Sequence, residues 1–262
     1  MTLELRSASL SIASRKVLDG ISLACAPGEV TAILGPNGAG KSSVLGLLAG
    51  ERKPDAGDVV LDGRPISAFA GAALARRRAV LTQGGSPAFA LKVFEFVRLA
   101  RAPFGESPET EAGYVGAALA RVGASCFADR LVASLSGGER QRVFIARALA
   151  QIDGEPEALP RYLLLDEPAA ALDLKHQEAI MRLARALADE GVGVVAVLHD
   201  PRAARRYADR CLLLRDGRAF AQGPSRLVLT ADHLCELFEI DRETAYGALG
   251  EARPVRHLHA AE

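Results

Sequence analysis

The chain has 262 residues, of which 49% are hydrophobic and 24% are charged. Lys plus Arg and Asp plus Glu balance at 32 each, which argues against a dedicated nucleic-acid-binding protein. No run approaches the roughly 20 apolar residues that a membrane-spanning helix needs, and the N-terminus has no apolar secretion segment. The four cysteines are scattered, so neither a disulfide framework nor a zinc site is expected. These features predict one large α/β domain in the cytoplasm, with room for an inserted lobe.

The hydrophobic pattern changes along the chain from strands to alternating strands and helices, then to a helical stretch, and back to strands. The expected elements, in chain order, are a small antiparallel sheet within 3–23, a strand at 29–35, a helix at 41–49, strands at 59–61 and 79–82, helices at 92–101, 108–122 and 138–151, a strand at 162–165, a helix at 173–190, a strand at 192–198 and a hairpin at 211–221. Residues from about 241 onward are polar and aperiodic and are expected to form a tail. The order predicts a parallel α/β sheet with an inserted helical segment.

A glycine-rich turn connects the strand at 29–35 to the helix at 41–49. Its residues are Gly35, Pro36, Asn37, Gly38, Ala39, Gly40, Lys41 and Ser42, followed by Ser43, and they match the phosphate-binding loop in its required strand–loop–helix context. Glycines allow backbone N–H groups to point inward, and the helix adds its positive end. We therefore expect this loop to bind a nucleoside triphosphate, with Lys41 on the β and γ phosphates and Ser42 on Mg²⁺. The alternative is a plain connecting turn.

Two adjacent carboxylates, Asp166 and Glu167, follow the apolar strand at 162–165. Carboxyl ends of parallel strands share one edge of a sheet, so these side chains are expected near the phosphate loop. One carboxylate suits Mg²⁺, through water, and the other can polarise an attacking water. An ordinary acidic turn is the alternative.

A third motif, Leu-Ser-Gly-Gly-Glu-Arg-Gln-Arg at 135–142, places Ser136, Gly137 and Gly138 at the start of a helix. Ser136 is a typical N-cap, and the following Glu139 suits the helix dipole. With the two preceding motifs in this order, the chain resembles the ATPase subunits of ABC (ATP-binding cassette) transporters from about Leu3 to Ile240. The resemblance implies a phosphate-loop NTPase (RecA-like) core with a small antiparallel β subdomain and an inserted α-helical subdomain.

The resemblance also implies how the sites are completed. Two copies pack head to tail, so that each ATP lies between the phosphate loop of one copy and Ser136, Gly137 and Gly138 of the other. Gln83 is similar to the glutamine that senses Mg²⁺ and the attacking water and couples to the permease. His199, after the strand at 192–198, resembles the switch histidine that contacts the γ phosphate.

The resemblance further implies that Asp173 ends the loop linking the two active sites. The expected catalytic residues are thus Glu167, His199 and Gln83, and the expected metal-site residues are Ser42, Gln83 and Asp166. The expected ligands are ATP and Mg²⁺.

Two departures from the family pattern stand out. Residues 8–14 offer only Leu10 and Ile12 where the family often has an aromatic that stacks on adenine, so this segment has no side chain for such stacking. Ala169 and Ala170 replace hydroxyl residues that many members carry after the Glu-Pro pair.

The resemblance divides the chain into a single ATPase domain at 1–240, with the helical subdomain at about 85–155, and a polar tail at 241–262. The motifs at 223–224, 229–234 and 238–241 resemble importers of iron chelates, cobalamin and haem, and the long spacer at 151–161 resembles the haem branch. The implied assembly is a homodimer with two transmembrane permease subunits, served indirectly by a periplasmic binding protein, at the cytoplasmic face of the inner membrane.

Three alternatives remain open from the sequence. A siderophore or cobalamin importer shares the same motifs. A soluble ABC-type ATPase acting on nucleic acid or ribosomes usually joins two cassettes or inserts a long coiled coil, and this chain has neither. A nucleotide-binding scaffold without hydrolysis would not need Glu167 and His199.

Other features are given structural interpretations. The arginines at 76–78 are expected in a solvated turn, and His257 and His259 in a frayed tail rather than at a metal. The apolar face of the helix at 92–101, with Val93 and Phe96, fits either core packing or a groove for the permease.

Overall fold

The computed structural model describes residues 2–81, 90–154, 161–168 and 173–251. The strands are β1 (Leu3–Ile12), β2 (Arg15–Cys25), β3 (Val30–Leu34), β4 (Ala56–Leu61), β5 (Arg64–Pro65), β6 (Arg78–Leu81), β7 (Tyr162–Asp166), β8 (Gly193–Val197), β9 (Arg210–Arg215) and β10 (Arg218–Pro224). The α-helices are α1 (Lys41–Leu48), α2 (Gly71–Ala75), α3 (Val93–Arg98), α4 (Pro108–Arg121), α5 (Gly137–Ile152), α6 (Leu174–Asp189), α7 (Pro201–Tyr207), α8 (Ser225–Val228), α9 (Ala231–Phe238) and α10 (Arg242–Leu249). Short 3₁₀ turns occupy 66–68, 99–101, 125–127 and 132–134.

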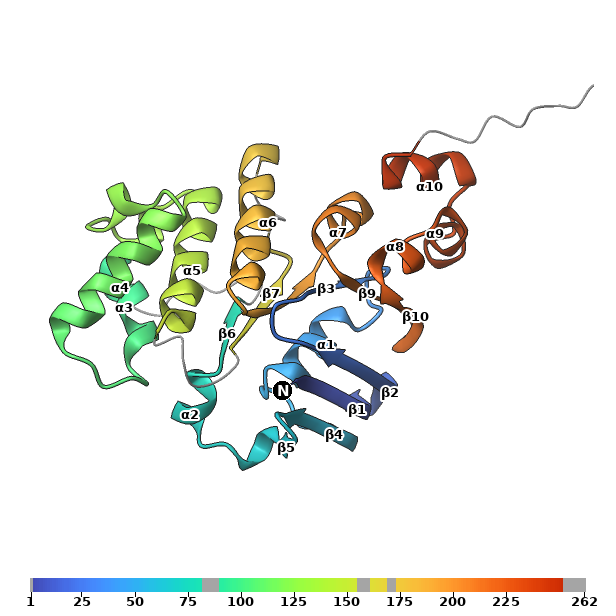
Figure 1. Cartoon of the computed structure of the whole chain (residues 1–262), viewed down its shortest axis with the longest axis horizontal. Coiled ribbons are helices and arrows are strands. Elements are labelled where there is room, and N and C mark those ends of the chain that lie inside the picture. The colour runs from blue at the N-terminus through green and yellow to red at the C-terminus, as the bar shows by residue number, and fades with distance from the viewer. Residues whose placement is uncertain (1, 82–89, 155–160, 169–172, 252–262) are drawn as a thin grey trace, which may run out of the picture.

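The strands form two sheets. The larger has the order β10-β9-β3-β8-β7-β6, in which β6, β7, β8, β3 and β9 run parallel and β10 is antiparallel to β9. The smaller is antiparallel, with the order β2-β1-β4-β5. Figure 1 shows the small sheet beside α1, and α3, α4 and α5 gathered in a lobe at the opposite side of the larger sheet from α8, α9 and α10. The predicted phosphate-loop core, β subdomain and helical lobe are therefore present.

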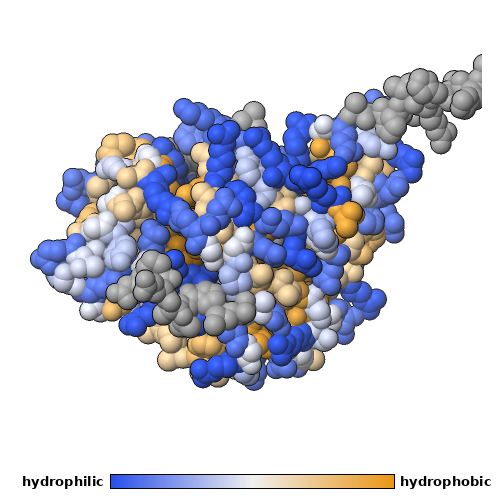
Figure 2. Space-filling model, in the orientation of Figure 1, coloured by the Kyte–Doolittle hydropathy of each residue, from blue (hydrophilic) through white to orange (hydrophobic). Residues whose placement is uncertain are grey.

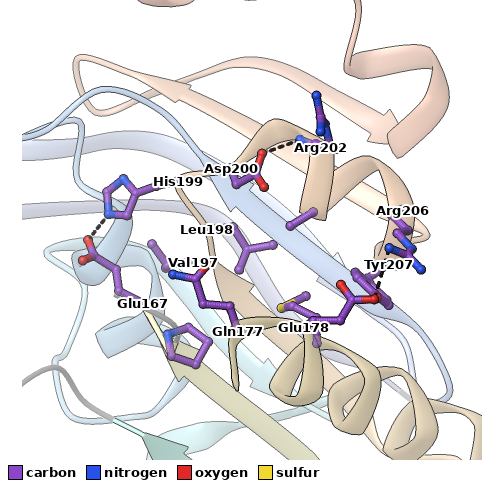
Figure 3. Close-up of a pocket in the computed structure, with 13 residues that line it drawn as sticks. Glu167, Gln177, Glu178, Val197, Leu198, His199, Asp200, Arg202, Arg206 and Tyr207 are labelled. Atoms are coloured by element: carbon purple, nitrogen blue, oxygen red, sulfur yellow. Dashed lines mark hydrogen bonds and ion pairs between the residues drawn. The ribbon is translucent and has the colours of Figure 1, made fainter. Parts of the chain in front are cut away.

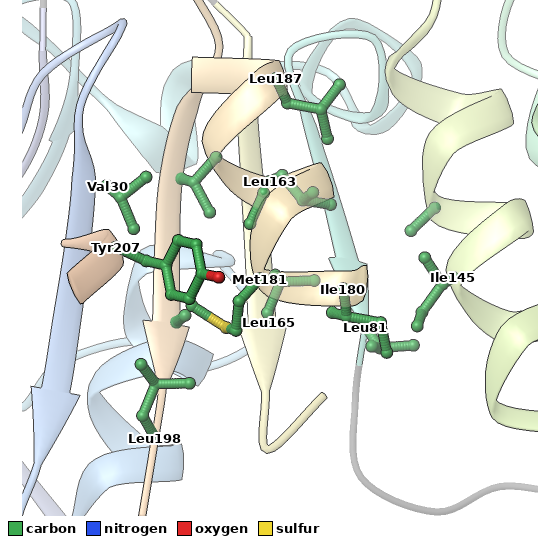
Figure 4. Close-up of a cluster of buried hydrophobic side chains, with 14 of the residues drawn as sticks. Val30, Leu81, Ile145, Leu163, Leu165, Ile180, Met181, Leu187, Leu198 and Tyr207 are labelled. Carbon is green, nitrogen blue, oxygen red and sulfur yellow. The ribbon is translucent and has the colours of Figure 1, made fainter. Parts of the chain in front are cut away.

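Side chains of the central strands alternate between two hydrophobic clusters, because successive residues of a strand point to opposite faces. On β8, Val194 and Ala196 join the cluster beneath α5, α6 and α7, while Val195 and Val197 join the cluster beneath α1 and the small sheet. Figure 4 shows the first cluster, where Ile180 and Met181 of α6 meet Leu163 and Leu165 of β7. Burial of both faces explains why these strands read as continuous apolar runs.

A buried arginine, Arg101, links separate segments of the helical lobe. Arg101 is fully buried; its guanidinium forms a salt bridge with Glu106 and donates to the carbonyl oxygens of Ala150 and Asp153 at the end of α5. Phe104 and Tyr114 stack on it, with guanidinium-to-ring distances of 3.7 and 3.9 Å. These contacts fix the C-terminal end of α5 relative to the rest of the lobe.

The chain beyond Asp241 differs from the aperiodic tail that the sequence predicts for 241–262. Asp241 accepts a hydrogen bond from the Thr244 amide at 2.8 Å and begins α10, whose Ala245 and Leu249 are buried. The helix packs on α9 and α7, so tertiary contacts stabilise a segment with few apolar residues. Residues 252–262, including His257 and His259, lie outside the described residues.

The prediction of a solvated turn for the arginines at 76–78 holds for Arg76, which is exposed in a turn, but not for Arg77 and Arg78. Arg77 is buried and pairs with Asp62, Arg76 donates to the Pro103 carbonyl at 2.7 Å, and Arg78 donates to the Ala49 carbonyl. They are structural groups that join β6 to neighbouring segments. In the helical lobe, Val93 and Phe96 of α3 are buried, as the core-packing interpretation of this helix expects.

The molecular surface carries the polar and charged side chains that the composition leads one to expect. The face in Figure 2 is mostly hydrophilic, with hydrophobic residues in smaller patches between the charged ones. None of the helices among the described residues combines the length and the apolarity needed to cross a membrane.

Candidate nucleotide site

The glycine-rich loop runs from the end of β3 to the start of α1, as predicted. Gly35, Gly38 and Gly40 have φ angles of 157, 80 and 102°. A Cβ at Gly35 would lie 2.1 Å from the Leu214 carbonyl oxygen, and one at Gly40 would lie 2.7 Å from a Leu18 methyl carbon. The loop is thus folded tightly against β9 and β2, in a shape that glycine alone fits without strain.

The residues expected to touch phosphate are arranged around this loop. Pro36 accepts a backbone bond from the Ala39 amide at 3.2 Å, and Gly40 accepts bonds from Ser43 and Val44, both at 3.0 Å. Asn37, Gly38 and Ser42 are exposed, whereas Ala39 and Lys41 are buried. The loop therefore presents a polar rim to the surface at the N-terminal, positive end of α1.

Backbone carbonyl groups of the loop hold the Lys41 side chain in place. Its Nζ donates to the carbonyl oxygens of Gly35 at 2.9 Å and Pro36 at 3.0 Å. Burial lowers the pKa of Lys41, and the nearby charges of Glu167 and Asp166 oppose that shift. A cation in this position is suited to bind phosphate oxygens.

Ser42 and Asp166 meet at the predicted edge of the sheet. The Ser42 hydroxyl donates to Asp166 Oδ1 at 3.2 Å, joining the start of α1 to the end of β7. Burial raises the pKa of Asp166; the Ser42 hydrogen bond lowers it and the Glu167 charge raises it. A hydroxyl and a carboxylate are oxygen ligands that Mg²⁺ accepts alongside phosphates and water.

The described residues contain no group of three or more His, Cys, Asp or Glu side chains able to hold a metal ion. Ser42 and Asp166 supply too few protein ligands for a dedicated metal cage. They fit a Mg²⁺ ion that arrives with the phosphates of a nucleotide.

Glu167 and His199 form the next feature. Their side chains are paired, with 2.6 Å between Glu167 Oε1 and His199 Nε2, as Figure 3 shows. Glu167 has a positive φ of 48°, which for a side-chain-bearing residue costs about 1–3 kcal/mol and is typical of functional sites. The sequence predicts both residues for the site, but neither the pairing nor the strained backbone can be read from residue types.

A pocket of about 220 Å³ borders this pair, between α6 and α7. Figure 3 shows Glu167 and His199 at one end and Glu178, Arg206 and Tyr207 at the other. The Glu167 side chain, which is expected to polarise water, is 16% exposed to solvent.

The Ser-Gly-Gly motif begins α5 in the helical lobe. Ser136 Oγ accepts from the Glu139 amide at 3.4 Å, and the Glu139 carboxylate accepts from the Ser136 amide at 2.8 Å. This reciprocal capping box fixes the first turn, and the Ser136 amide lowers the pKa of Glu139. Ser136 and Gly137 are exposed.

Asp173 begins the helix predicted for 173–190: it is the N-cap of α6 and accepts a hydrogen bond from the His176 amide at 2.9 Å. It is exposed, like Ser136. Gln83 and the pair Ala169 and Ala170 lie outside the described residues, so their predicted roles stay predictions.

One contact that sequence reasoning missed joins two of these motifs. Gln141 of α5 donates from Nε2 to the Pro168 carbonyl at 3.0 Å, directly beside Glu167. The only sequence signal is a Gln within the Ser-Gly-Gly helix.

A model of the ABC transporter family matches residues 18–170, which contain the phosphate loop, the Ser-Gly-Gly motif and the two carboxylates. The chain belongs to the ABC transporter family. The matched range includes the glycine-rich loop, Asp166, Glu167 and the start of α5, and an ABC ATPase binds a nucleotide.

Curated relatives extend the ABC match over most of the chain. A hemin import ATP-binding protein, HmuV, of Gloeobacter violaceus is 46% identical over 84% of this chain and 81% of that protein. The protein of the same name from Pseudomonas entomophila is 46% identical over 91% and 93%.

Solved ABC structures have the same fold. A metal-chelate-type ABC transporter in an inward-facing conformation has a TM-score of 0.75 and 28% identity, covering 91% of this chain and 89% of that one. An ATP-binding cassette solved as a dimer in a post-hydrolysis state with ADP and Pi has a TM-score of 0.74 and 28% identity, covering 86% and 99%.

Proposed function

We propose that this chain is the ATP-hydrolysing subunit of an ABC importer that takes up haem across the bacterial inner membrane. The observation that carries the cargo assignment is the 46% identity, over 81 to 93% of their length, to proteins named for hemin import. Cargo does not bind this subunit in the proposed assembly, so the assignment rests on that likeness rather than on a pocket.

In this proposal two copies form a homodimer on two permease subunits, at the cytoplasmic face of the membrane, and a periplasmic binding protein delivers the cargo. Support for the dimer comes from the exposure of Ser136, Gly137 and Asp173, which leaves these residues available to a second copy. The likeness to a cassette solved as a dimer also supports it.

The geometry within one chain supports the proposed roles of the described residues, and the proposed role of Gln83 rests on the family resemblance. Lys41 and the loop from Gly35 to Ser43 hold the phosphates, because an ammonium group and a helix N-terminus meet there. Ser42 and Asp166 hold Mg²⁺, with Gln83 as a further contact. When bound, Mg²⁺ neutralises charge on the phosphate oxygens.

Glu167 is proposed to orient and polarise the attacking water, since it directly follows Asp166, whose pKa its charge raises, and its side chain is 16% exposed. His199 holds that carboxylate at 2.6 Å and is proposed to contact the γ phosphate. The helix N-terminus at Ser136, Gly137 and Gly138 is proposed to bind the phosphates held by the other copy.

A siderophore or cobalamin importer is the second candidate, favoured by the likeness to a metal-chelate-type transporter at 28% identity. An ATPase acting on nucleic acid is less favoured, because the charges balance at 32 each.

The test is to copurify the chain with its permease, reconstitute the complex in liposomes and measure ATP hydrolysis with periplasmic binder loaded with haem, cobalamin or a ferric siderophore. The proposal expects stimulation by the haem-loaded binder and haem accumulation inside the liposomes. Stimulation by another cargo alone would contradict the haem assignment and leave the ATPase assignment standing. Absence of ATP hydrolysis by the complex would contradict both.

A further inference from the structure

The contact between Gln141 and Pro168 links two motifs that are far apart in sequence. Gln141 Nε2 donates to the Pro168 carbonyl oxygen at 3.0 Å, and the bond is partly buried. Pro168 itself is buried, and a carbonyl removed from water needs a hydrogen-bond donor. The Gln141 amide supplies that donor from the helical lobe.

Pro168, whose carbonyl accepts this bond, directly follows Glu167. Glu167 has a φ of 48°, a backbone conformation that persists only where surrounding contacts hold it. On one side its carboxylate is held by His199 at 2.6 Å. On the other, the Gln141 bond holds the next residue, whose proline ring already restricts the backbone.

The same helix carries Ser136 at its N-terminus. Ser136 and Gln141 lie on one rigid segment, about 7.5 Å apart along the axis at a rise of about 1.5 Å per residue. The capping box between Ser136 and Glu139 fixes the first turn, so Gln141 follows any displacement of that turn.

We propose that Gln141 is a positioning residue for Glu167, tying this carboxylate to the helix whose N-terminus faces the nucleotide held by the other copy. The inference rests on the proposed dimeric ATPase. Within that assembly, a shift of α5 on engaging the other copy moves the Pro168 peptide and so sets the orientation of Glu167. In this proposal Gln141 acts through Glu167 and is not itself a catalytic residue.

The test replaces Gln141 by leucine, which has nearly the same volume and cannot donate. A matched control exists on the same helix: Gln151 donates from Nε2 to the carbonyl oxygens of Ala75 and Arg78, both at 3.0 Å, at the far end of α5 from Glu167. Gln141→Asn, one methylene shorter, provides a second variant that keeps a polar surface while losing reach.

Full-length Gln141→Leu should lose about tenfold or more in kcat, since a misplacement of about 1 Å can cost on the order of 100-fold. Its Kd for ATP should stay within about twofold, because Lys41 and the phosphate loop are untouched. Gln151→Leu should keep kcat within about twofold of the parent.

A structural defect and a positioning role are separated by repeating Gln141→Leu in a Glu167→Gln background. If Gln141 acts through Glu167, single-turnover hydrolysis should fall by less than about twofold further there, because groups acting as a unit are not additive. ATP-dependent dimerisation of the double variant should match that of Glu167→Gln.

Four results would overturn the inference: unchanged kcat in Gln141→Leu and Gln141→Asn, an equal fold-loss in both backgrounds, loss of ATP affinity or dimerisation, or an equal loss in Gln151→Leu. Failure of the parent chain to hydrolyse ATP would instead count against the proposed function. The two failures are therefore distinguishable.

Discussion

Replacing Glu167 by glutamine should stop turnover while leaving nucleotide binding intact. The substitution keeps the shape and one oxygen that can still accept from His199, which lies 2.6 Å away. It removes the charge and the proton acceptor. A positioned general base contributes about 10²- to 10⁴-fold, so the barrier to hydrolysis should rise by about 2.7–5.4 kcal/mol at about 1.36 kcal/mol per tenfold.

The assay is phosphate release by the purified chain at saturating Mg²⁺ and ATP, with the Kd for ATP measured separately by equilibrium binding. The Kd should change by less than about threefold, because the groups around Lys41 that bind phosphate remain. Glu178→Gln is the matched control: Glu178 lines the same pocket but pairs with Arg182 and Arg206, each at 3.1 Å. Hydrolysis that is undiminished in Glu167→Gln, or reduced equally in Glu178→Gln, would refute the reasoning.

Three further outcomes follow from the loop and its neighbours. Lys41→Ala should weaken ATP binding about 10- to 150-fold by equilibrium dialysis, the equivalent of one charge-assisted bond of about 1.5–3 kcal/mol, and unchanged affinity would contradict the role of Lys41. Gly40→Ala should lower the melting temperature of the nucleotide-free chain more than Gly38→Ala, because its Cβ would meet Leu18 at 2.7 Å whereas the space beside Gly38 is open; equal shifts would contradict the packing argument. Asp173→Ala should lower the melting temperature near pH 7, because the cap at the start of α6 is lost. The His176 amide holds the pKa of Asp173 below its usual 3.8, so the stabilisation is present above pH 3.8 and is lost as the pH falls through the lowered pKa; a difference that grows in acid would have the wrong sign.

Much of the catalytic arrangement could be predicted because its signals are local. The phosphate loop, the carboxylates after β7 and the capped start of α5 are each marked by a short run of residues, and the parallel sheet brings the strand ends together. Ser42 and Asp166 are far apart in sequence yet hydrogen-bonded, as the shared sheet edge predicts.

What the sequence could not predict depends on tertiary contacts. The positive φ of Glu167 is unusual for a residue with a side chain, and nothing in its neighbours signals it. The α10 helix has few apolar residues and is stabilised partly by Arg202 of α7, which donates to the Gly247 carbonyl at 3.1 Å. The sequence predicts that Arg77 is exposed to solvent, but its side chain is buried and pairs with Asp62.

The central claim is that two copies of this chain close around ATP. Its most direct test is sedimentation equilibrium of Glu167→Gln with and without ATP and Mg²⁺, with Ser136→Arg as a variant that blocks the exposed start of α5. The account predicts a monomer without nucleotide, a dimer with two bound ATP molecules in its presence, and a monomer in the Ser136→Arg double variant. A Glu167→Gln chain that binds ATP and remains monomeric would contradict it.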